Sequence, residues 1–471
     1  MKVLLIDVPF GSEDIGGKHR NFAGVLNVIP ALGLAYLAAV AEEDGHEVRI
    51  LDCARGLGWS AVSEAGRSLQ PDVVGITATT PTFYNARRTA SLLRGIVPRA
   101  AFVVGGPHPT AMPEHTAASD VFDFLVLGEG ERTFVDLLRH VEGRGALRPD
   151  DIPGLAFQRS GELVFTPSRD PISDLDLIPF PARRLLPPLG VYSPTPASYR
   201  RLPLAHIMTS RGCPTRCNFC DKAVFGEQYR ARSAGNVLAE VEEVVHTWGA
   251  REIRFFDDTF TLNRRRLEAI CQGMKRLRPR TPWTCLTKVN AVDLDMLRTM
   301  RDSGCWQVLY GLESGDDRVL STLGKNTTVE QNRRAVRWAR QAGLRVRADF
   351  IVGTPRETPE TLENTLRFAK SLPLDFAHFN KFVPFPGTAF YRQIVAAGYP
   401  LDFSGSSSTL DHDALVYVPP AVPERQYRAF LDKAYKAFYL RPRYIIRRLA
   451  GLRTFTEFWG NFKGAFSMGR M

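Results

Sequence analysis

Two stretches of the chain alternate apolar strands with helices, and this alternation constrains the fold more than any other feature. In residues 2–142 the predicted strands are Lys2–Val8, His46–Asp52, Asp72–Thr77, Ala101–Gly105 and Asp123–Leu127, and the predicted helices are 31–44, 83–97 and 130–142. Apolar strands joined by helices are typical of a doubly wound parallel sheet. The ligands of such sheets bind in the loops at the carboxyl ends of the strands.

The second alternating stretch begins at Leu204. Its predicted strands are Leu204–Thr209, Glu252–Asp257, Trp283–Asn290, Cys305–Leu312, Arg345–Val352 and Phe376–Phe382. Six strand–helix units are too few for a closed eightfold barrel, so the pattern predicts a partial barrel that is open on one side.

The rest of the chain forms a linker between these two α/β parts and a region after the second. Residues 155–167 resemble a hairpin that turns at Ser160-Gly161, and the proline-rich stretch after them predicts an ordered connector instead of a helix. We therefore expect four parts. They are an α/β domain over residues 1–149, a linker over 150–203, a partial barrel over 204–390 and a basic, aromatic helical region over 391–471.

Composition excludes several classes of protein. The chain has 471 residues, of which 44% are hydrophobic, and no apolar run reaches the roughly 18 residues of a transmembrane helix. Seven cysteines are too few for a disulfide scaffold. Three of the seven fall within eight residues, which indicates metal chemistry in a reducing compartment, and we expect a cytoplasmic protein.

The cysteine cluster is the most specific motif. It reads Cys213-Pro-Thr-Arg-Cys217-Asn-Phe-Cys220 and follows the first strand of the second stretch directly. Thiolates bind iron–sulfur clusters and zinc, and structural zinc usually takes four protein ligands. This loop offers three, which on a four-iron cluster would leave one iron open to another ligand. A zinc or redox-thiol site is the alternative.

The spacing, with the aromatic Phe219 before the last cysteine, resembles that of the radical S-adenosylmethionine (SAM) enzymes. The resemblance implies that Cys213, Cys217 and Cys220 hold a [4Fe–4S] cluster whose open iron binds the amino and carboxylate groups of SAM. One electron then cleaves SAM to methionine and a 5′-deoxyadenosyl radical, which abstracts hydrogen. An external reductant of the flavodoxin or ferredoxin type is implied as a partner.

The same resemblance assigns SAM contacts to the ends of the barrel strands. Glu313 corresponds to a ribose-binding acid, Gly353 lies near the expected adenine, and Lys288 stands where relatives often carry Arg near the SAM carboxylate. Each motif alone is equally typical of a helix cap or a turn. The candidate SAM-binding residues are Phe219, Asp257, Asp258, Lys288, Glu313, Ser314 and Gly353.

Three loops of the first stretch form a further pattern, TATTPT from Thr77, GGPHPT from Gly105 and GEGERT from Gly128. Glycines allow a backbone to approach a ligand closely. Together the loops resemble the cobalamin-binding domain of one branch of radical SAM enzymes. The candidate cobalamin contacts are Thr77, Thr79, Thr80, Gly105, Gly106, His108, Gly128, Glu129 and Glu131.

One departure from general cobalamin domains concerns the axial ligand. The stretch from Asp7 reads DVPFGS and lacks their histidine motif, as the radical SAM branch commonly does. The resemblance therefore implies cobalamin with its base displaced and no histidine on cobalt. His108 is either a contact to the cobalamin tail or a loop histidine whose hydrogen bonds are satisfied by the protein.

Methylthiotransferases share the two-part outline but carry a second cysteine triad in the N-terminal domain. Here Cys53 is the only cysteine before Cys213. The remaining cysteines, Cys271, Cys285 and Cys305, are dispersed through predicted helix and strand, and we expect them to be core residues.

The C-terminal region is strongly basic. From Glu424 to Met471 there are 11 Lys and Arg against 3 Asp and Glu, interleaved with aromatic residues that suggest two short helices. We expect a helical cap on the barrel. The alternative is contact with anionic lipid, which would place the protein peripherally at the inner membrane surface. No nucleic-acid partner is expected, because no accompanying nucleic-acid-binding fold is recognisable.

The resemblance implies a cobalamin-dependent radical SAM methyltransferase. Such an enzyme methylates an unactivated carbon of a small-molecule or natural-product substrate, large apolar ones included, through methylcobalamin and the 5′-deoxyadenosyl radical. No catalytic residue of the protein itself is assigned. The alternatives are a cyclase or rearrangement enzyme with the same cofactors, and a non-catalytic cobalamin sensor, which would not need an iron with an open site.

Overall fold

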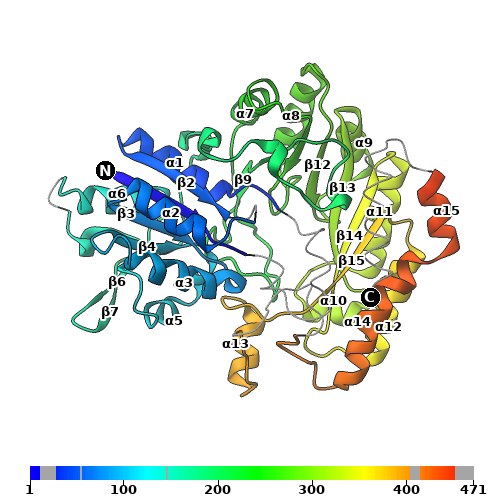
Figure 1. Ribbon diagram of the computed structural model, residues 1–471. Coiled ribbons are helices and arrows are strands. Elements are labelled where there is room, and N and C mark those ends of the chain that lie inside the picture. The colour runs from blue at the N-terminus through cyan, green and yellow to red at the C-terminus, as the bar shows by residue number, and fades with distance from the viewer. Residues whose placement is uncertain (11–27, 54–55, 145–146, 404–413, 451–471) are drawn as a thin grey trace.

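A computed structural model describes residues 1–10, 28–53, 56–144, 147–403 and 414–450. Two α/β bodies lie side by side, and a helical C-terminal segment runs along the far side of the second body (Figure 1). No helix in these ranges is both long and apolar enough to cross a membrane.

The first body is built on a seven-stranded sheet with the strand order β2-β1-β3-β4-β5-β6-β7. Strands β1 to β5 are parallel, and the antiparallel β6 and β7 extend one edge. The strands are β1 (Lys2–Asp7), β2 (Glu47–Asp52), β3 (Val73–Thr77), β4 (Ala101–Gly105), β5 (Phe124–Val126), β6 (Leu155–Arg159) and β7 (Glu162–Phe165).

Helices cover both faces of this sheet, as the alternation predicts. Helices α1 and α6 share one apolar cluster with the sheet, and α2 and α3 share the other. The chain order of the strands reverses between β1 and β3, which is where sheets of this kind open a crevice for a ligand. The helices are α1 (Leu32–Glu43), α2 (Trp59–Leu69), α3 (Phe83–Arg94), α4 (Pro107–Ala111), α5 (Pro113–Ala117) and α6 (Gly130–Val141).

The second body holds a six-stranded parallel sheet with the order β15-β14-β13-β12-β11-β8. Because β8 and β15 are the two outer strands, the sheet is the partial barrel that six units predict. Its strands are β8 (Leu204–Ile207), β11 (Glu252–Phe255), β12 (Trp283–Thr287), β13 (Cys305–Glu313), β14 (Arg345–Val352) and β15 (Phe376–Lys381).

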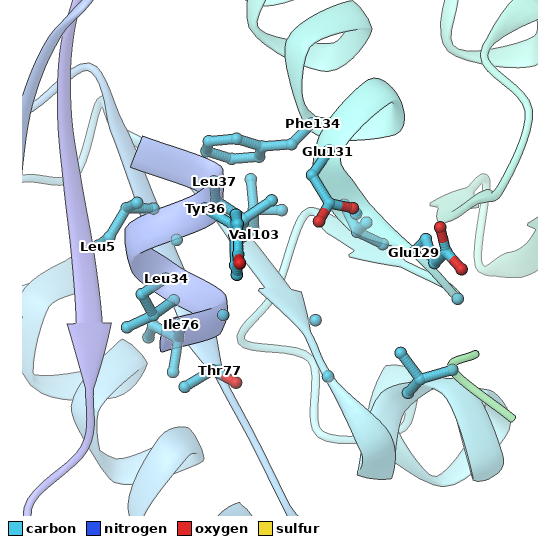
Figure 2. Close-up of a pocket in the computed structure, with 18 of the residues that line it drawn as sticks. Leu5, Leu34, Tyr36, Leu37, Ile76, Thr77, Val103, Glu129, Glu131 and Phe134 are labelled. Carbon is cyan, nitrogen blue, oxygen red and sulfur yellow. The ribbon is translucent and has the colours of Figure 1, made fainter. Parts of the chain in front are cut away.

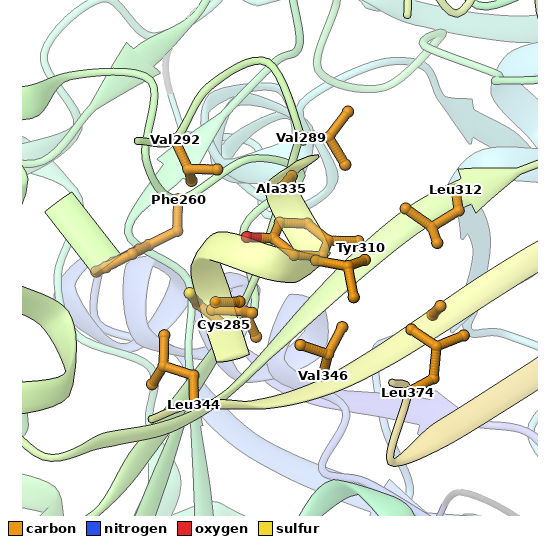
Figure 3. Close-up of a cluster of buried hydrophobic side chains, with 14 of the residues drawn as sticks. Phe260, Cys285, Val289, Val292, Tyr310, Leu312, Ala335, Leu344, Val346 and Leu374 are labelled. Atoms are coloured by element: carbon orange, nitrogen blue, oxygen red, sulfur yellow. The ribbon is translucent and has the colours of Figure 1, made fainter. Parts of the chain in front are cut away.

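The barrel strands alternate with helices that bury one face of the sheet. Figure 3 shows the apolar cluster between them, in which Cys285, Tyr310 and Val346 lie together. Cys271, Cys285 and Cys305 are all buried in this cluster, so the prediction that they are core residues is confirmed. The helices are α7 (Ala234–His246), α8 (Arg264–Arg276), α9 (Leu294–Asp302), α10 (Asp317–Thr322), α11 (Val329–Gln341) and α12 (Pro359–Ser371).

The segment between the two bodies is ordered and contains no α-helix. The predicted hairpin turns at Ser160-Gly161 and joins the first sheet as β6 and β7. Short 3₁₀ turns follow in the proline-rich connector, at Leu175–Leu177, Arg183–Leu185, Leu189–Val191 and Pro196–Ser198.

The C-terminal segment packs its aromatic residues on the barrel. After α13 (Ala389–Ala396), helices α14 (Glu424–Tyr439) and α15 (Pro442–Ala450) run along the outer strand β15. The β15 backbone is bonded by tyrosine hydroxyls: Tyr435 accepts from the Phe379 amide at 3.2 Å, and Tyr439 accepts from the Ala377 amide at 3.0 Å. Residues 451–471 of the predicted basic tail lie outside the described residues.

Candidate active site

The cysteine loop lies between two very short strands that pair with each other, β9 (Ser210–Arg211) and β10 (Arg230–Ala231). Within it Cys217 is buried, whereas Cys213 and Cys220 are partly or fully exposed. A hydrogen bond from the Cys220 thiol, together with the nearby Lys325 ammonium, lowers the pKa of Cys217 to about 5. The loop therefore favours the thiolate at Cys217, the form that binds iron, while the same bond and burial raise the pKa of Cys220.

The three cysteines do not form a compact site for a single metal ion. Among the described side chains, no three of the His, Cys, Asp or Glu type are close enough to hold one metal ion. A four-iron cluster would take each of the three cysteines on a different iron. The Cys213 sulfur instead lies 3.0 Å from the hydroxyl of Thr215 within the same loop.

Lysine side chains stand beside the cysteines. Lys288 follows β12, is 8% exposed, and its ammonium has no hydrogen-bond partner in the part of the chain that the structure describes. Burial lowers the pKa of Lys288, while the three thiols oppose that shift. A buried ammonium without a partner is costly, and the carboxylate of SAM has the chemistry to pair with it.

Glu313 and Lys325 form a buried ion pair at the end of β13, with 2.7 Å between the carboxylate and the ammonium. Glu313 has φ of 61°, a region that residues other than glycine rarely adopt outside functional sites. Lys325 was not among the sequence candidates. It follows a glycine after α10, and no local pattern marks it, because its role depends on contacts with distant residues.

The other SAM candidates also lie at strand ends but have partners in the protein. Asp257 accepts bonds from the Thr209 amide at 2.6 Å and from the Ser210 hydroxyl at 2.6 Å. Ser314 bonds the hydroxyl of Thr365 at 2.9 Å. Asp258 is exposed at the end of β11, the ring of Phe219 lies 5.7 Å from the Lys325 ammonium, and Gly353 donates its amide to Glu357.

A pocket opens at the carboxyl ends of the first sheet (Figure 2). Leu5 and Val103 line its depth, and Thr77 lies on the wall formed by β3. The empty space within it, including the part open to solvent, is about 780 Å³. The predicted cobalamin residues that line it are Thr77, Gly105, Gly106, Gly128, Glu129 and Glu131.

Gly106 shows why the wall of this pocket needs glycine. Its φ is 102°, and a Cβ there would lie 3.0 Å from both the Ala78 carbonyl oxygen and the Thr77 hydroxyl. Only a residue without a side chain lets these two loops meet and leaves the backbone open to a ligand. The pocket therefore fits a group that inserts along the strand ends, as the tail of cobalamin would.

The remaining cobalamin candidates lie beside the pocket. Thr79 donates its amide to the Thr82 hydroxyl at 2.9 Å, which caps a short 3₁₀ turn. Thr80 bonds His108 at 3.2 Å, and the His108 ring is stacked on Phe83 with centroids 4.1 Å apart. His108 also bonds the ring of His115. Its hydrogen bonds are thus satisfied by the protein.

Buried ion pairs join the pocket to the cysteine loop. Arg211 in β9 bonds Glu129 at 3.2 Å and Glu131 at 2.5 Å, and Arg230 in β10 also bonds Glu129. The two acids thus line the pocket and pair with arginines that flank the cysteines. The arginines were not sequence candidates, because the pairing joins positions at least 80 residues apart.

The far wall of the pocket belongs to the second body. It includes Met208, directly after β8, together with Val224 and Phe225, which follow Cys220 in the cysteine loop. The fold and site therefore define an α/β protein in which a ligand pocket at the strand ends of the first sheet shares a wall with the cysteine loop.

Comparison with known proteins agrees with this definition. The family model of the radical SAM superfamily matches residues 207–369, and that of the B12 binding domain matches residues 21–138. An uncharacterized methyltransferase of Pyrococcus horikoshii is 36% identical over 95% of this chain and 94% of its own. An anaerobic magnesium-protoporphyrin IX monomethyl ester cyclase of Cereibacter sphaeroides is 31% identical over 80% of this chain and 62% of its own.

The fold is that of a solved structure as well. The radical SAM methyltransferase TsrM of Kitasatospora setae, determined with cobalamin and a [4Fe–4S] cluster, superposes over 100% of this chain and 98% of its own, with a TM-score of 0.72 and 18% identity. The chain belongs to the radical SAM enzymes that carry a B12-binding domain. The cofactors of this family are a [4Fe–4S] cluster, SAM and cobalamin.

Proposed function

We propose that this enzyme is a cobalamin-dependent radical SAM methyltransferase that methylates an unactivated carbon of a small molecule. The observation that carries the proposal is the shared wall: Val224 and Phe225 of the cysteine loop line the pocket at the strand ends of the B12-binding domain. A methyl donor held in that domain would lie next to the radical source.

The residues of the chain would divide the work as follows. Cys213, Cys217 and Cys220 would hold the cluster, and the Lys288 ammonium would bind the SAM carboxylate. Glu313, with Ser314 beside it, would bind the ribose, and Gly353 would border the adenine. When bound, the cluster and SAM supply a hydrogen-abstracting radical, and cobalamin supplies the methyl group. Phe219, Asp257 and Asp258 would complete the SAM site.

The cobalamin-binding domain would contribute position and shelter. Thr77, Gly105, Gly106 and Gly128 would border the inserted tail, and Glu129 and Glu131 would fix the pocket against the cysteine loop through Arg211. Thr79, Thr80 and His108 would support the loop from behind. The electron would come from an external reductant of the flavodoxin or ferredoxin type.

The two half-reactions test the proposal without knowledge of the substrate. The anaerobically reconstituted, reduced holoenzyme should convert SAM both to S-adenosylhomocysteine, as methyl is passed to cobalamin, and to 5′-deoxyadenosine. Replacement of Cys213, Cys217 and Cys220 by Ala should abolish 5′-deoxyadenosine formation. Cleavage that persists in this triple variant would contradict the radical SAM assignment of the loop.

The cobalamin pocket has its own test. Gly106→Val should weaken binding of hydroxocobalamin, because a branched side chain at φ of 102° would collide with Ala78 and Thr77. Gly58→Ala is the matched control in the same domain, since a Cβ there meets no atom within 4 Å. Wild-type protein should give the absorption spectrum of cobalamin with its base displaced. Equal binding of hydroxocobalamin by wild type, Gly106→Val and Gly58→Ala would contradict the assignment of this pocket to cobalamin.

A cyclase is the second candidate, favoured by the 31% identity to the cyclase of Cereibacter sphaeroides. The chain spans less than two thirds of that protein. A cyclase would form 5′-deoxyadenosine but no S-adenosylhomocysteine. With a substrate in hand, a product heavier by one CH₂ identifies methyl transfer.

A further inference from the structure

The face of the barrel sheet opposite its helices is unusually polar. Side chains alternate between the two faces of a strand, and Ile253 and Phe255 of β11 pack against the helices. Arg254 between them must therefore lie on the other, inner face. The strand register places His206 of β8 and Thr284 of β12 on either side of Arg254.

Several of these inner-face groups are buried without partners. The His206 ring is 2% exposed, and neither of its nitrogens has a hydrogen-bond partner among the described residues. The Thr284 hydroxyl and the amide nitrogen of Gln307, its neighbour on β13, are likewise unsatisfied. Buried polar groups of a native protein are almost always bonded, so this row indicates that a polar ligand completes it.

A second arginine lies next to this row, because the register places Arg347 level with Leu309, the next inward-facing residue after Gln307 on β13. Arg347 of β14 bonds Ser198 at 2.9 Å and His378 at 3.2 Å, and lies 3.4 Å from Asp349, the carboxylate that offsets one guanidinium. Arg254 forms no hydrogen bond or ion pair with any described residue, although its guanidinium stands 5.7 Å from the Phe256 ring. The inner face therefore carries the guanidinium groups of Arg254 and Arg347 near the carboxylates of Asp349 and Glu252, and the Arg254 side chain contacts neither carboxylate directly.

The two histidines do not offset or add to this charge. Burial, reinforced by Arg254, lowers the pKa of His206 to about 3. Burial, reinforced by Arg347, lowers the pKa of His378 to about 4. Both rings are neutral at pH 7 and can each donate one hydrogen bond.

In the layer below, both carboxylate oxygens of Glu252 have partners in the protein. Glu252 accepts bonds from the amides of Arg200 and Arg201 at 2.8 and 2.7 Å, and from the indole of Trp306 at 2.9 Å. Above the polar row, Asp349 lies level with Gly311, two residues before Glu313. The row thus lies between Glu252 and the predicted SAM site.

We propose that Arg254, Arg347 and His206 bind an anionic group of the substrate, a carboxylate, phosphate or phosphonate, on the inner face of the barrel. This inference rests on the proposed function, because it names the substrate class of that same site. At roughly 3.3 Å per strand residue, the anionic group would lie on the order of 10 Å from the carbon that reacts beside SAM. The expected substrate therefore has an anionic end and an extended body.

Simple anions serve as probes. Inorganic phosphate, methylphosphonate and acetate would each be titrated calorimetrically into the full-length holoenzyme at constant ionic strength. The comparison includes Arg254→Gln, Arg254→Lys, Arg347→Gln and the control Arg276→Gln, whose side chain is exposed on α8. We expect at least one probe to bind wild type and R276Q with equal affinity. The affinity of R254Q and of R347Q for that probe should be at least tenfold lower, and that of R254K should be within about fivefold of wild type.

Thermal unfolding provides the second measurement. Because R254Q removes a largely buried guanidinium that has no hydrogen-bond partner among the described residues, its Tm in anion-free buffer should equal or exceed that of wild type, and saturating probe should no longer raise it. Tighter binding of phosphate and methylphosphonate would identify the substrate group as a phosphate or phosphonate. Tighter binding of acetate would identify it as a carboxylate. Binding that is unchanged in both R254Q and R347Q, or absent from wild type for all three probes, overturns the proposal.

These outcomes are separable from those of the proposed function. Formation of 5′-deoxyadenosine and S-adenosylhomocysteine without substrate depends on the cofactor sites and not on Arg254. Loss of the half-reactions in wild type with intact anion binding would overturn the methyltransferase alone.

Discussion

Lys288 carries a buried ammonium group, which we propose binds the carboxylate of SAM. Its ammonium has no protein partner among the described residues, and the three cysteines are its neighbours. We expect Lys288→Gln to raise the KM for SAM roughly tenfold or more, because a hydrogen bond to a charged group is lost. Measured cluster content should be unchanged.

Two variants make this result specific. Lys288→Arg keeps the charge and should recover most of the affinity, whereas Lys275→Gln, exposed on α8, should leave the KM for SAM unaltered. An unchanged KM in K288Q would assign the SAM carboxylate to another group, for which Lys325 is the nearest candidate.

Glu357 is a second residue whose charge is buried. One carboxylate oxygen accepts from the amides of Gly353 and Thr354 at 2.6 and 2.7 Å, and the other has no partner in the described chain. Burial raises the pKa of Glu357 to about 7. Between about pH 4.5 and 7, Glu357 keeps its proton in the folded protein but loses it in the unfolded chain. The free energy of unfolding therefore falls as pH rises through that window.

The variant Glu357→Gln should remove this dependence. Its amide oxygen can accept the same bonds without a charge, so at pH 5 its unfolding free energy should match that of wild type. At pH 8 it should exceed wild type by up to about 3 kcal/mol. Denaturant titrations at the two pH values measure the difference, and Glu360→Gln, on the surface, should show none.

At the scale of elements, strands were predicted more reliably than contacts. All eleven predicted strands of the two alternating stretches occur, with ends that agree within three residues, and the predicted hairpin occurs as well, because apolar runs bounded by turns carry the signal locally. Helix α2 was not predicted, nor were the two-residue strands β9 and β10. The pairings of Lys325 with Glu313, and of Arg211 with Glu131, depend on packing that no local pattern encodes.

Helix α14 covers the outer strand β15, two of whose backbone amides donate to tyrosine hydroxyls of this helix. Its Tyr435 and Tyr439 are one helical turn apart and bond the amides of alternate residues along β15. We expect the double variant Tyr435→Phe and Tyr439→Phe to lose about 1–3 kcal/mol, because it leaves two buried amides without an acceptor. Chemical denaturation measures this loss, and Tyr84→Phe, on an exposed tyrosine of α3, should be neutral.

These contacts bear on the predicted role of the C-terminal region. The buried side chains Tyr427, Phe430 and Phe438 pack into the barrel core, as a cap requires. Truncation after Pro423 should therefore lower both solubility and turnover whether or not lipid is present. A truncated enzyme with full activity, and salt-sensitive binding of the intact one to anionic liposomes, would instead favour the lipid alternative.

At the scale of the molecule, Glu129 joins the two bodies. Its carboxylate pairs with Arg211 and Arg230, and all three side chains are at most 6% exposed. We expect Glu129→Ala to cost roughly 3–5 kcal/mol, because it leaves the buried guanidinium of Arg230 without its carboxylate, while Arg211 keeps Glu131. Calorimetry should then resolve separate unfolding of the two bodies, while Glu64→Ala, exposed on α2, should keep the wild-type profile.

The cover that α14 provides for β15 has a consequence during synthesis. Ribosomes add roughly 5–20 residues per second, and α14 follows β15 in the chain, so the sheet is complete some seconds before its edge is sealed. In that interval the outer backbone of β15 can pair with another nascent chain. Chaperone occupancy of the nascent polypeptide should therefore peak between the emergence of these two elements from the exit tunnel.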